Sequence, residues 1–456
     1  MYHRQFFRQL TIGGAVLALA ANWAAKPAHA EATILVEVDS GKVLRAENAT
    51  YPWYPASVTK LMTLYTTLQA VKQGRITLDT LFKVSHTALA QSPTKMGFAL
   101  GTQVTVDNAI KMMMVKSAND MAVLLAEGVD GSIENFADDM TRTAHRLGMS
   151  ESNFVNPNGL PADEQITSAR DMAILARALI RDFPEYDSYL HIPAIKFGRR
   201  VIRNYNTLLG RYPGADGMKT GFICASGFNL VATATRNGKR LIAVVLGAPS
   251  SSSRTVKAAE LLESGFTQNP LSWLTPALGA VDALTPISAA PPNLHDEVCG
   301  RHRKKPAAED EDADAGDQNN GENGAAFSTL LSSLRAPTPK GAALLSDQGA
   351  VTPVVVYTGP TRTPDQIAKL EAIEPPAPRH KKKGVAGTAA KHPEEKAADG
   401  KATDGKRTDG KPWTPLSSST LATAPPSELQ APPAVETAKK PPKAKAAAKP
   451  APATAQ

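Results

Sequence analysis

The sequence is poor in cysteine and contains no pattern of metal ligands. Only Cys224 and Cys299 occur among its 456 residues, which excludes a disulfide-rich scaffold and a zinc cluster built on cysteine. The nine histidines form no His-Glu-x-x-His motif or comparable ligand spacing, so we expect neither a metal nor another cofactor. The chain also has no internal repeat. Its chemistry must therefore come from ordinary polar side chains.

Long apolar runs are also missing beyond the first thirty residues. The one such run, Leu10–Ala25, follows several basic residues and precedes Ala28–Ala30, a small-x-small cleavage pattern. This order predicts a secretion signal over residues 1–30, cleaved after its last alanine. The run is short for a membrane span and Asn22 interrupts it, so an uncleaved anchor is the less favoured alternative. Export would place the protein in the periplasm or cell envelope, away from nucleic acid.

Three short motifs follow one another in a particular order. Ser57–Lys60 reads Ser-Val-Thr-Lys, Ser117–Asn119 reads Ser-Ala-Asn, and Lys219–Gly221 reads Lys-Thr-Gly. Each motif alone is common by chance, but the ordered set is typical of enzymes that form an acyl intermediate on a serine. The sequence therefore indicates an active-site serine acyltransferase.

The first motif supplies both a nucleophile and a base. A serine hydroxyl is a weak nucleophile at neutral pH, and a lysine three residues later on a helix lies on the same face. Apolar residues recur at three- and four-residue steps from Val58 to Gly74, which predicts a helix facing a core. Ser57 would then lie at the helix N-terminus, within reach of Lys60 and close to the positive end of the helix dipole.

A second Ser-x-x-Lys sequence, Ser92–Lys95, lacks this context. Gly97 and Gly101 follow it, and no apolar stripe continues beyond the lysine. No long buried helix would hold this serine and lysine together, so we interpret the segment as a surface loop.

The pattern of elements predicts one α+β domain over residues 31–268. A hairpin is expected from Thr33 to Ala46 and a mainly helical block from Ser57 to about Arg181. Strands are expected at Gly217–Ile223, Phe228–Thr235 and Leu241–Leu246, with Asn237-Gly238 as a tight turn and a helix at Arg254–Phe266. Strands at both ends of a helical block favour one antiparallel sheet with helices packed on it.

Residues 269–456 have a different composition. Proline, alanine and lysine dominate, and acidic and basic runs alternate, so we predict a disordered tail. Val354–Tyr357 is a short β-prone island in it and is interpreted as a docking segment. The net charge of +8 is compatible with peripheral contact between the tail and an anionic membrane or the cell wall, although scattered lysines are more often only solvated.

Four longer stretches resemble one known family. Tyr54–Thr63, Asn158–Leu160, Asp216–Gly221 and Ser226–Ala232 are similar to signature stretches of the low-molecular-mass penicillin-binding proteins that act as serine D-alanyl-D-alanine carboxypeptidases. The resemblance implies a β-lactamase/transpeptidase-like fold, peptidoglycan stem peptides as substrates and β-lactam antibiotics as inhibitors. It covers the whole of the predicted domain.

The resemblance also implies roles for the first two motifs. Ser57 would attack the carbonyl between two terminal D-alanines, release the last one and form an acyl-enzyme that water hydrolyses. Lys60 would be the base, and Ser117 would relay a proton toward the leaving amine. Asn119 would orient Lys60 and the substrate amide.

The third motif is expected to bind the other end of the scissile group. The backbone N–H groups of Ser57 and Phe222 would form the oxyanion hole. Lys219 and Thr220 would hold the free carboxylate of the substrate, and Gly221 would let the strand approach closely.

Two positions are less typical. Arg254 matches the carboxylate-binding arginine of the family by its distance from the Lys-Thr-Gly motif; the alternative is an exposed charge at the start of a helix. Ala118 stands where the family commonly has glycine or aspartate, which would change the shape of the cleft wall. The β-rich second domain and amphipathic C-terminal anchor of many relatives are not apparent in the sequence.

Other interpretations remain open. The same chemistry would serve a D,D-endopeptidase that cuts cross-links, and a wall-binding protein would remain if Ser57 were unreactive. A β-lactamase is less favoured, because the sequence around Glu164 does not resemble the loop that holds its deacylating water. Cys224 and Cys299 are able to pair after export, but Cys224 lies just past the third motif, and we interpret it as a small apolar side chain filling space there.

Overall fold

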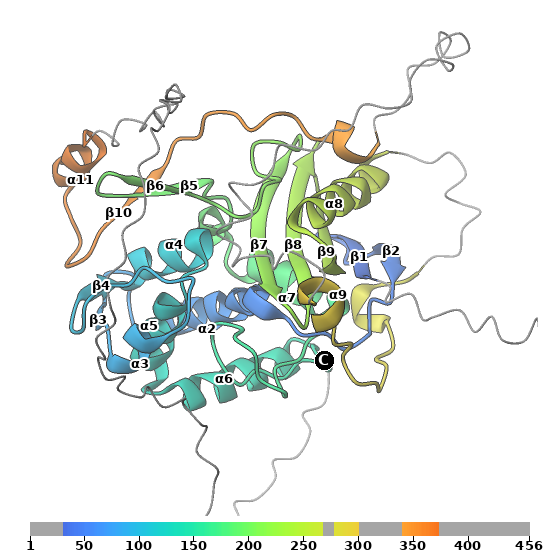
Figure 1. Cartoon of the computed structure of the whole chain (residues 1–456), viewed down its shortest axis with the longest axis horizontal. Helices are drawn as coiled ribbons and strands as arrows, with labels where there is room; N and C mark the ends of the chain where they lie inside the picture. The colour runs from blue at the N-terminus through green and yellow to red at the C-terminus, as the bar shows by residue number, and fades with distance from the viewer. Residues whose placement is uncertain (1–30, 268–277, 301–339, 374–456) are drawn as a thin grey trace, which may run out of the picture. The chain divides into compact units, whose positions relative to one another are not determined.

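The computed structural model describes residues 31–267, 278–300 and 340–373 of the chain (Figure 1). The predicted secretion signal, residues 1–30, lies outside the described residues. Within the three described ranges, no helix is long and apolar enough to cross a membrane.

A five-stranded antiparallel sheet is built from both ends of residues 31–267, which we call the main block. The strand order is β2-β1-β9-β8-β7. The strands are β1 (Ala32–Glu37), β2 (Val43–Glu47), β7 (Ala215–Ile223), β8 (Gly227–Arg236) and β9 (Lys239–Ala248). Asn237 and Gly238 have φ of 51° and 76°, the left-handed pair that the tight turn between β8 and β9 requires. The predicted α+β fold class is confirmed, and β7 forms one edge of the sheet.

Helices fill the chain between β2 and β7. They are η1 (Ala56–Thr59), α2 (Lys60–Lys72), α3 (His86–Ala90), α4 (Val106–Lys116), α5 (Asn119–Asp130), α6 (Ile133–Arg146), α7 (Ala169–Asp182) and η2 (Pro184–Leu190). The short strands β3 (Leu81–Lys83) and β4 (Gln103–Thr105) pair with each other. Ser132 and Ser168 cap α6 and α7, because their side chains accept hydrogen bonds from the first helical turn.

The core lies on both faces of the sheet. Consecutive residues of β8 and β9 are buried, although they point to opposite faces. α7 packs against β9 and β1, while α8 (Ser251–Phe266) packs against β8 and β9, and Figure 1 shows the two helices on opposite sides of the sheet. Sandwiching between helices explains why these two strands read as almost continuous apolar runs.

Two segments of the predicted tail fold against the main block, so the predicted disorder is wrong for residues 278–300 and 340–373. The first contains η4 (Val281–Ala283) and α9 (His295–Cys299), and the second contains η5 (Gly341–Leu344), β10 (Val354–Val356) and α11 (Pro364–Glu371). Each segment buries a few apolar side chains within a polar sequence. Composition averaged over the tail hides such short clusters. The rest of the predicted tail, residues 269–277, 301–339 and 374–456, lies outside the described residues.

The predicted docking segment is a strand. β10 pairs in parallel with β5 (Ala194–Phe197), and β5 pairs with β6 (Arg200–Arg203) in an antiparallel hairpin. These strands form a separate three-stranded sheet with the order β10-β5-β6. The prediction that Val354–Tyr357 is β-prone and docks is therefore confirmed.

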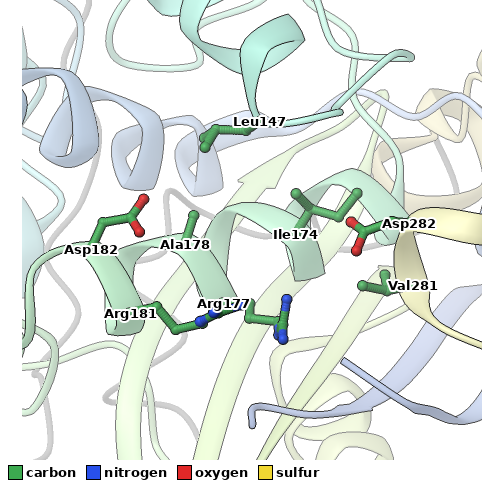
Figure 2. A pocket seen from close by; sticks show the side chains of 8 residues that line it. All are labelled: Leu147, Ile174, Arg177, Ala178, Arg181, Asp182, Val281 and Asp282. Carbon is green, nitrogen blue, oxygen red and sulfur yellow. The ribbon is translucent and has the colours of Figure 1, made fainter. Parts of the chain in front are cut away.

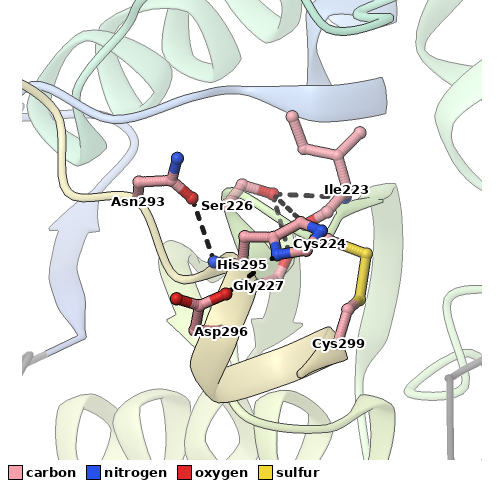
Figure 3. The surroundings of a disulfide bond; sticks show 8 residues. All are labelled: Ile223, Cys224, Ser226, Gly227, Asn293, His295, Asp296 and Cys299. Atoms are coloured by element: carbon pink, nitrogen blue, oxygen red, sulfur yellow. Dashed lines mark hydrogen bonds and ion pairs between the residues drawn. A yellow bond between two sulfur atoms is a disulfide. The ribbon is translucent and has the colours of Figure 1, made fainter. Parts of the chain in front are cut away.

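A disulfide joins Cys224, just past β7, to Cys299 at the end of α9 (Figure 3). The interpretation of Cys224 as an unpaired apolar filler is wrong. Its partner reaches it because residues 278–300 return to the main block, where the Leu294 backbone N–H donates to the Ala225 carbonyl at 2.9 Å. The bond thus holds α9 beside the turn between β7 and β8.

Replacing both cysteines with serine is expected to lower the free energy of unfolding by about 2–5 kcal/mol, because the cross-link joins residues 75 positions apart. Urea denaturation of the oxidised wild type and the double variant measures the difference. Reduced wild-type protein is the control and should match the variant. Equal stability of the oxidised protein and the variant would contradict the prediction.

Asp187 lies in the short helix η2 and connects this helix to the large sheet. Its carboxylate accepts hydrogen bonds from Arg240 on β9 at 3.0 and 3.1 Å and lies 3.0 Å from the Nε2 atom of His191. Burial opposes ionisation, but the hydrogen bonds from His191 and Arg240 outweigh it and lower the pKa of Asp187. The folded-state pKa is below the unfolded one, so this stabilisation is present above the ordinary aspartate pKa and is lost as the pH falls through the folded-state value.

Asp187→Asn is therefore expected to lower the free energy of unfolding by about 1 kcal/mol at pH 7. The difference from the wild type should shrink to nothing as the pH falls below the lowered folded-state pKa of Asp187, where both side chains are neutral. Denaturation curves across this pH range test it. Asp296→Asn, at a fully exposed aspartate, should leave the stability unchanged at every pH. A difference for Asp187→Asn that is independent of pH would contradict the linkage.

Candidate active site

The first motif forms a sharp turn that leads into a buried helix. Ser57 lies in η1, and Lys60 is the first residue of α2. Ala56 has a φ of 50°, a left-handed conformation that is costly for a residue with a Cβ atom and often marks a functional turn. The Lys60 Nζ atom lies 2.9 Å from the Ser57 Oγ atom. The structure thus brings the predicted nucleophile and base together, as their helical spacing predicts.

Lys60 is completely buried and is surrounded by oxygen atoms. Besides Ser57, its Nζ atom donates to the Asn119 Oδ1 atom at 2.8 Å and to the Asn158 carbonyl at 2.7 Å. A buried ammonium group is tolerated only when such acceptors replace water. Lys60 therefore joins the first motif, the second motif and the 156–160 loop.

Two buried hydroxyl groups at the site lack protein partners. Ser117 follows α4 with φ 59° and ψ 29°, a left-handed conformation that directs the chain sharply into α5. Among the described residues, neither the Ser117 Oγ atom nor the Thr220 Oγ1 atom has a hydrogen-bond partner. Buried polar groups are nearly always paired in native proteins, so both hydroxyls are positioned to bind a ligand.

The third motif lies directly against the nucleophile turn. A methyl group on Gly221 would lie 2.8 Å from the Ser57 backbone nitrogen and 2.9 Å from that of Val58, so a larger residue would push β7 away. The Phe222 ring stacks on Phe228 of β8, with ring centres 4.2 Å apart. Because β7 is a sheet edge, its outer backbone groups are not used by another strand.

Two cations are buried beside this strand. Lys219 is 1 % exposed and Arg254 is 2 % exposed, so the interpretation of Arg254 as an exposed charge is wrong. The Arg254 guanidinium lies 3.3 Å from the Asn229 carbonyl and 3.5 Å from the Gly221 carbonyl, which belong to paired residues of β7 and β8. The Lys219 Nζ atom donates to the Thr220 carbonyl at 3.0 Å. Both cations raise the positive potential at the Lys-Thr-Gly strand.

The second Ser-x-x-Lys sequence is non-helical, as predicted, but it is more than a surface loop. Thr94 is buried and donates to the Ser117 carbonyl, and the Asn119 Nδ2 atom donates to the Ser92 carbonyl at 2.9 Å. Asp120 accepts from the backbone N–H of Gly97 at 2.8 Å and also from that of the preceding methionine. Burial raises the pKa of Asp120, and these backbone hydrogen bonds oppose the shift. The loop therefore packs on the second motif.

The sequence alone gave no role to the 156–160 loop. Its Asn158 carbonyl accepts from Lys60, and Gln165 braces it by donating to the Asn156 carbonyl and to Thr59. Gly159 has a φ of 79°, and a methyl group there would lie 1.8 Å from the Ala56 carbonyl oxygen. The Asn-Gly pair signals a turn, but a backbone acceptor leaves no residue-type signal.

Glu164 lies elsewhere. It is exposed and lines a shallow pocket with α6 residues such as Asp138 and Arg142. Its backbone carbonyl accepts from Asn153. Among the described residues, the oxygen atoms within hydrogen-bond distance of the Lys60 Nζ atom come from Ser57, Asn119 and Asn158, and Glu164 is not one of them.

A cavity of about 330 Å³ also lies apart from these residues (Figure 2). It is lined by Leu147, Ile174, Arg177, Ala178, Arg181, Asp182, Val281 and Asp282. Arg177 is already engaged, because it donates to the carbonyls of Val38 and Asp39. In the part of the chain that the structure describes, no group of three or more His, Cys, Asp or Glu side chains is arranged to hold a metal ion.

Comparison with known proteins places this geometry in a family. The D-alanyl-D-alanine carboxypeptidase family, Peptidase S11, matches residues 20–250. The chain belongs to this family. The matched residues include all three motifs and every strand of the large sheet.

Individual relatives agree with the family match. The chain is 38 % identical over 242 residues to D-alanyl-D-alanine carboxypeptidase DacA of Haemophilus influenzae, covering 52 % of this chain and 62 % of that protein. It is 31 % identical over 253 residues to DacB2 of Mycobacterium tuberculosis, covering 53 % of this chain and 84 % of that protein. The crystal structure of the carboxypeptidase DacD from Francisella tularensis aligns with a TM-score of 0.51 at 32 % identity, over 54 % of this chain and 72 % of that one. The chain thus spans less than two thirds of the Haemophilus relative.

The close contact at Gly159 gives a test of the site's packing. Gly159→Ala is expected to lower the free energy of unfolding by about 3 kcal/mol or more, because the methyl group collides with the Ala56 carbonyl. Gly148→Ala is the matched control: Gly148 has a similar φ of 85°, but a methyl group there meets nothing, so it should cost only about 1 kcal/mol. Urea unfolding of both variants measures the difference. Equal losses in the free energy of unfolding would contradict the prediction, because they would mean that the nucleophile turn moves to make room for the methyl group without cost.

Proposed function

We propose that the protein is a serine D-alanyl-D-alanine carboxypeptidase that removes the terminal D-alanine from peptidoglycan stem peptides. The observation that carries the proposal is the position of the Lys60 Nζ atom, within hydrogen-bond distance of both Ser57 and Asn119, while β7 packs against the nucleophile turn. Family membership supports the same chemistry.

Acylation begins at Ser57. The neutral amine form of Lys60 accepts the hydroxyl proton while the Oγ atom attacks the carbonyl carbon of the penultimate D-alanine. The backbone N–H groups of Ser57 and Phe222 stabilise the negative charge that develops on the carbonyl oxygen. The bond from that carbon to the terminal nitrogen then breaks, and Ser117 gives its hydroxyl proton to the departing amine while it takes the proton held by Lys60, which returns Lys60 to its neutral form. An ester on Ser57 and free D-alanine result.

Deacylation reverses the proton path. A water molecule attacks the ester carbon and gives a proton to the basic site around Lys60, and the Ser57 oxygen leaves with a proton. Asn119 holds the Lys60 Nζ atom throughout, because its Oδ1 atom accepts from Nζ and its own amide is fixed by the Ser92 carbonyl. The shortened stem peptide is released.

Recognition of the free carboxylate favours a carboxypeptidase over a cross-link-cutting endopeptidase. The unpaired Thr220 hydroxyl and the positive charges of Lys219 and Arg254 lie at one strand beside Ser57, where a C-terminal carboxylate would bind. In a cross-linked substrate, the group beyond the scissile nitrogen is the side chain of a second stem peptide instead of a terminal D-alanine. Glu164 is exposed and lines a pocket with residues of α6, which likewise disfavours a β-lactamase.

The predicted signal over residues 1–30 supports export to the periplasm or cell envelope, where peptidoglycan stem peptides are available. β-lactam antibiotics are the expected inhibitors, since they acylate a serine of this geometry. We include peripheral contact of the basic tail with the membrane or the cell wall in the proposal on the grounds of charge alone.

Incubation with a penicillin followed by intact-mass measurement tests this function. The wild type should gain one drug mass and should release D-alanine from a stem peptide ending in D-Ala-D-Ala, while Ser57→Ala should do neither. Ser92→Ala, at the serine of the second Ser-x-x-Lys sequence, should behave like the wild type, because only its backbone carbonyl contacts the site. Rapid drug turnover without an adduct would indicate a β-lactamase, and no adduct or turnover would refute the catalytic assignment.

A further inference from the structure

Residues 340–371 follow a continuous path over the main block. The Ser346 backbone N–H donates to the Arg211 carbonyl at 2.9 Å, β10 then pairs with β5, and the Gly359 N–H donates to the Gln103 carbonyl of β4 at 2.7 Å. Thr361 donates to Asp79. Figure 1 shows this segment, in orange, passing from α8 to the β5–β6 hairpin and ending in α11.

Basic side chains of the main block hold the backbone of this segment. Arg211 donates to the Ser346 carbonyl at 2.9 Å, Arg203 to the Gly349 carbonyl at 3.4 Å, and Lys196 to the Glu371 carbonyl at 2.5 Å. Lys196 is buried, and a buried ammonium group requires such an acceptor. The hairpin therefore supplies hydrogen-bond donors that hold the backbone of the segment.

The segment contacts the helix that leads to Ser117. The Tyr357 backbone N–H donates to the Asn108 Oδ1 atom in the first turn of α4 at 3.0 Å. Strands β5, β6 and β10 all pack against α4, which ends at Ser117. Val356 and Tyr357 are buried where these elements meet. The helix that leads to Ser117, the proposed proton relay, therefore packs against β10 and the β5–β6 hairpin.

A second line of contacts leads to Lys60. The Phe197 ring of β5 lies 5.3 Å from that of Phe98, which belongs to the 91–101 loop. The first two residues of this loop fix both asparagines around the lysine. Gln91 accepts from the Asn158 side chain at 2.8 Å, and the Ser92 carbonyl accepts from the Asn119 side chain at 2.9 Å.

We propose that residues 340–371 are a positioning segment of the active site, which holds the 91–101 loop and α4 in place through the β5–β6 hairpin. Phe98, Phe197 and Val356 are positioning residues, because none contacts the reacting atoms and each acts through the loop or the helix. The proposal rests on the proposed function only in using acylation of Ser57 as its readout.

The main test uses the full chain with Val355→Asp and Val356→Asp together. Two carboxylates at these buried positions cannot remain docked against β5. Acylation by a fluorescent penicillin is followed as a function of drug concentration. The limiting acylation rate should fall at least tenfold, while the half-saturating concentration changes less than threefold, because the geometry around Lys60 changes more than the cleft itself.

Two variants separate positioning from loss of folding. Thr352→Asp, at an exposed residue just before β10, should acylate within twofold of the wild type. Arg203→Ala with Arg211→Ala loosens the segment without burying a charge and should slow acylation about threefold, even if the aspartate variant fails to fold.

Phe98→Leu tests the route. If the segment acts through this ring, adding the two aspartates to Phe98→Leu should slow acylation by less than the product of the separate effects. Unchanged rates in the aspartate and arginine variants, with a normally acylated wild type, would overturn the positioning role alone. An unreactive wild type would instead overturn the proposed function.

Discussion

The buried ammonium group of Lys60 is the constraint on which the rest of the site depends. A cation without water must be surrounded by oxygen acceptors, and here they come from η1, from the start of α5 and from the 156–160 loop. Each acceptor group must itself be held in place by hydrogen bonds. Gln91, Ser92 and Gln165 make these hydrogen bonds from other segments, so the buried side chain of Lys60 links much of the helical block.

The elements that the sequence predicted well are those with local signals. The apolar period of α2 and the Asn237-Gly238 turn each involve neighbours in the chain, and the structure contains both. The three motifs also converge as their order indicated. Their convergence depends on helical spacing and on close approach at Gly221, both of which residue type reveals.

The features that the sequence did not reveal are non-local. The Asn158 carbonyl is a backbone atom, so no side chain marks it as a contact of Lys60. Cys299 meets Cys224 only because Leu294 and Val298 bury themselves against the main block, and this depends on a surface that exists only after folding. β10 was visible as a β-prone island, but its partner β5 could not be inferred. The composition of a segment is a property of that segment alone, whereas its packing also depends on the surface of the main block that it contacts.

The strand order has a consequence for the timing of folding. β1 begins the described chain, yet it lies between β2 and β9, and its pairing with β9 joins residues about two hundred positions apart. A chain still emerging from the ribosome can form the β1–β2 hairpin early, but one edge of β1 stays open until residue 248 has been made. Such long-range pairing slows folding. A slow final step of this kind would keep the newly made chain loosely structured until β9 has been made and has paired with β1.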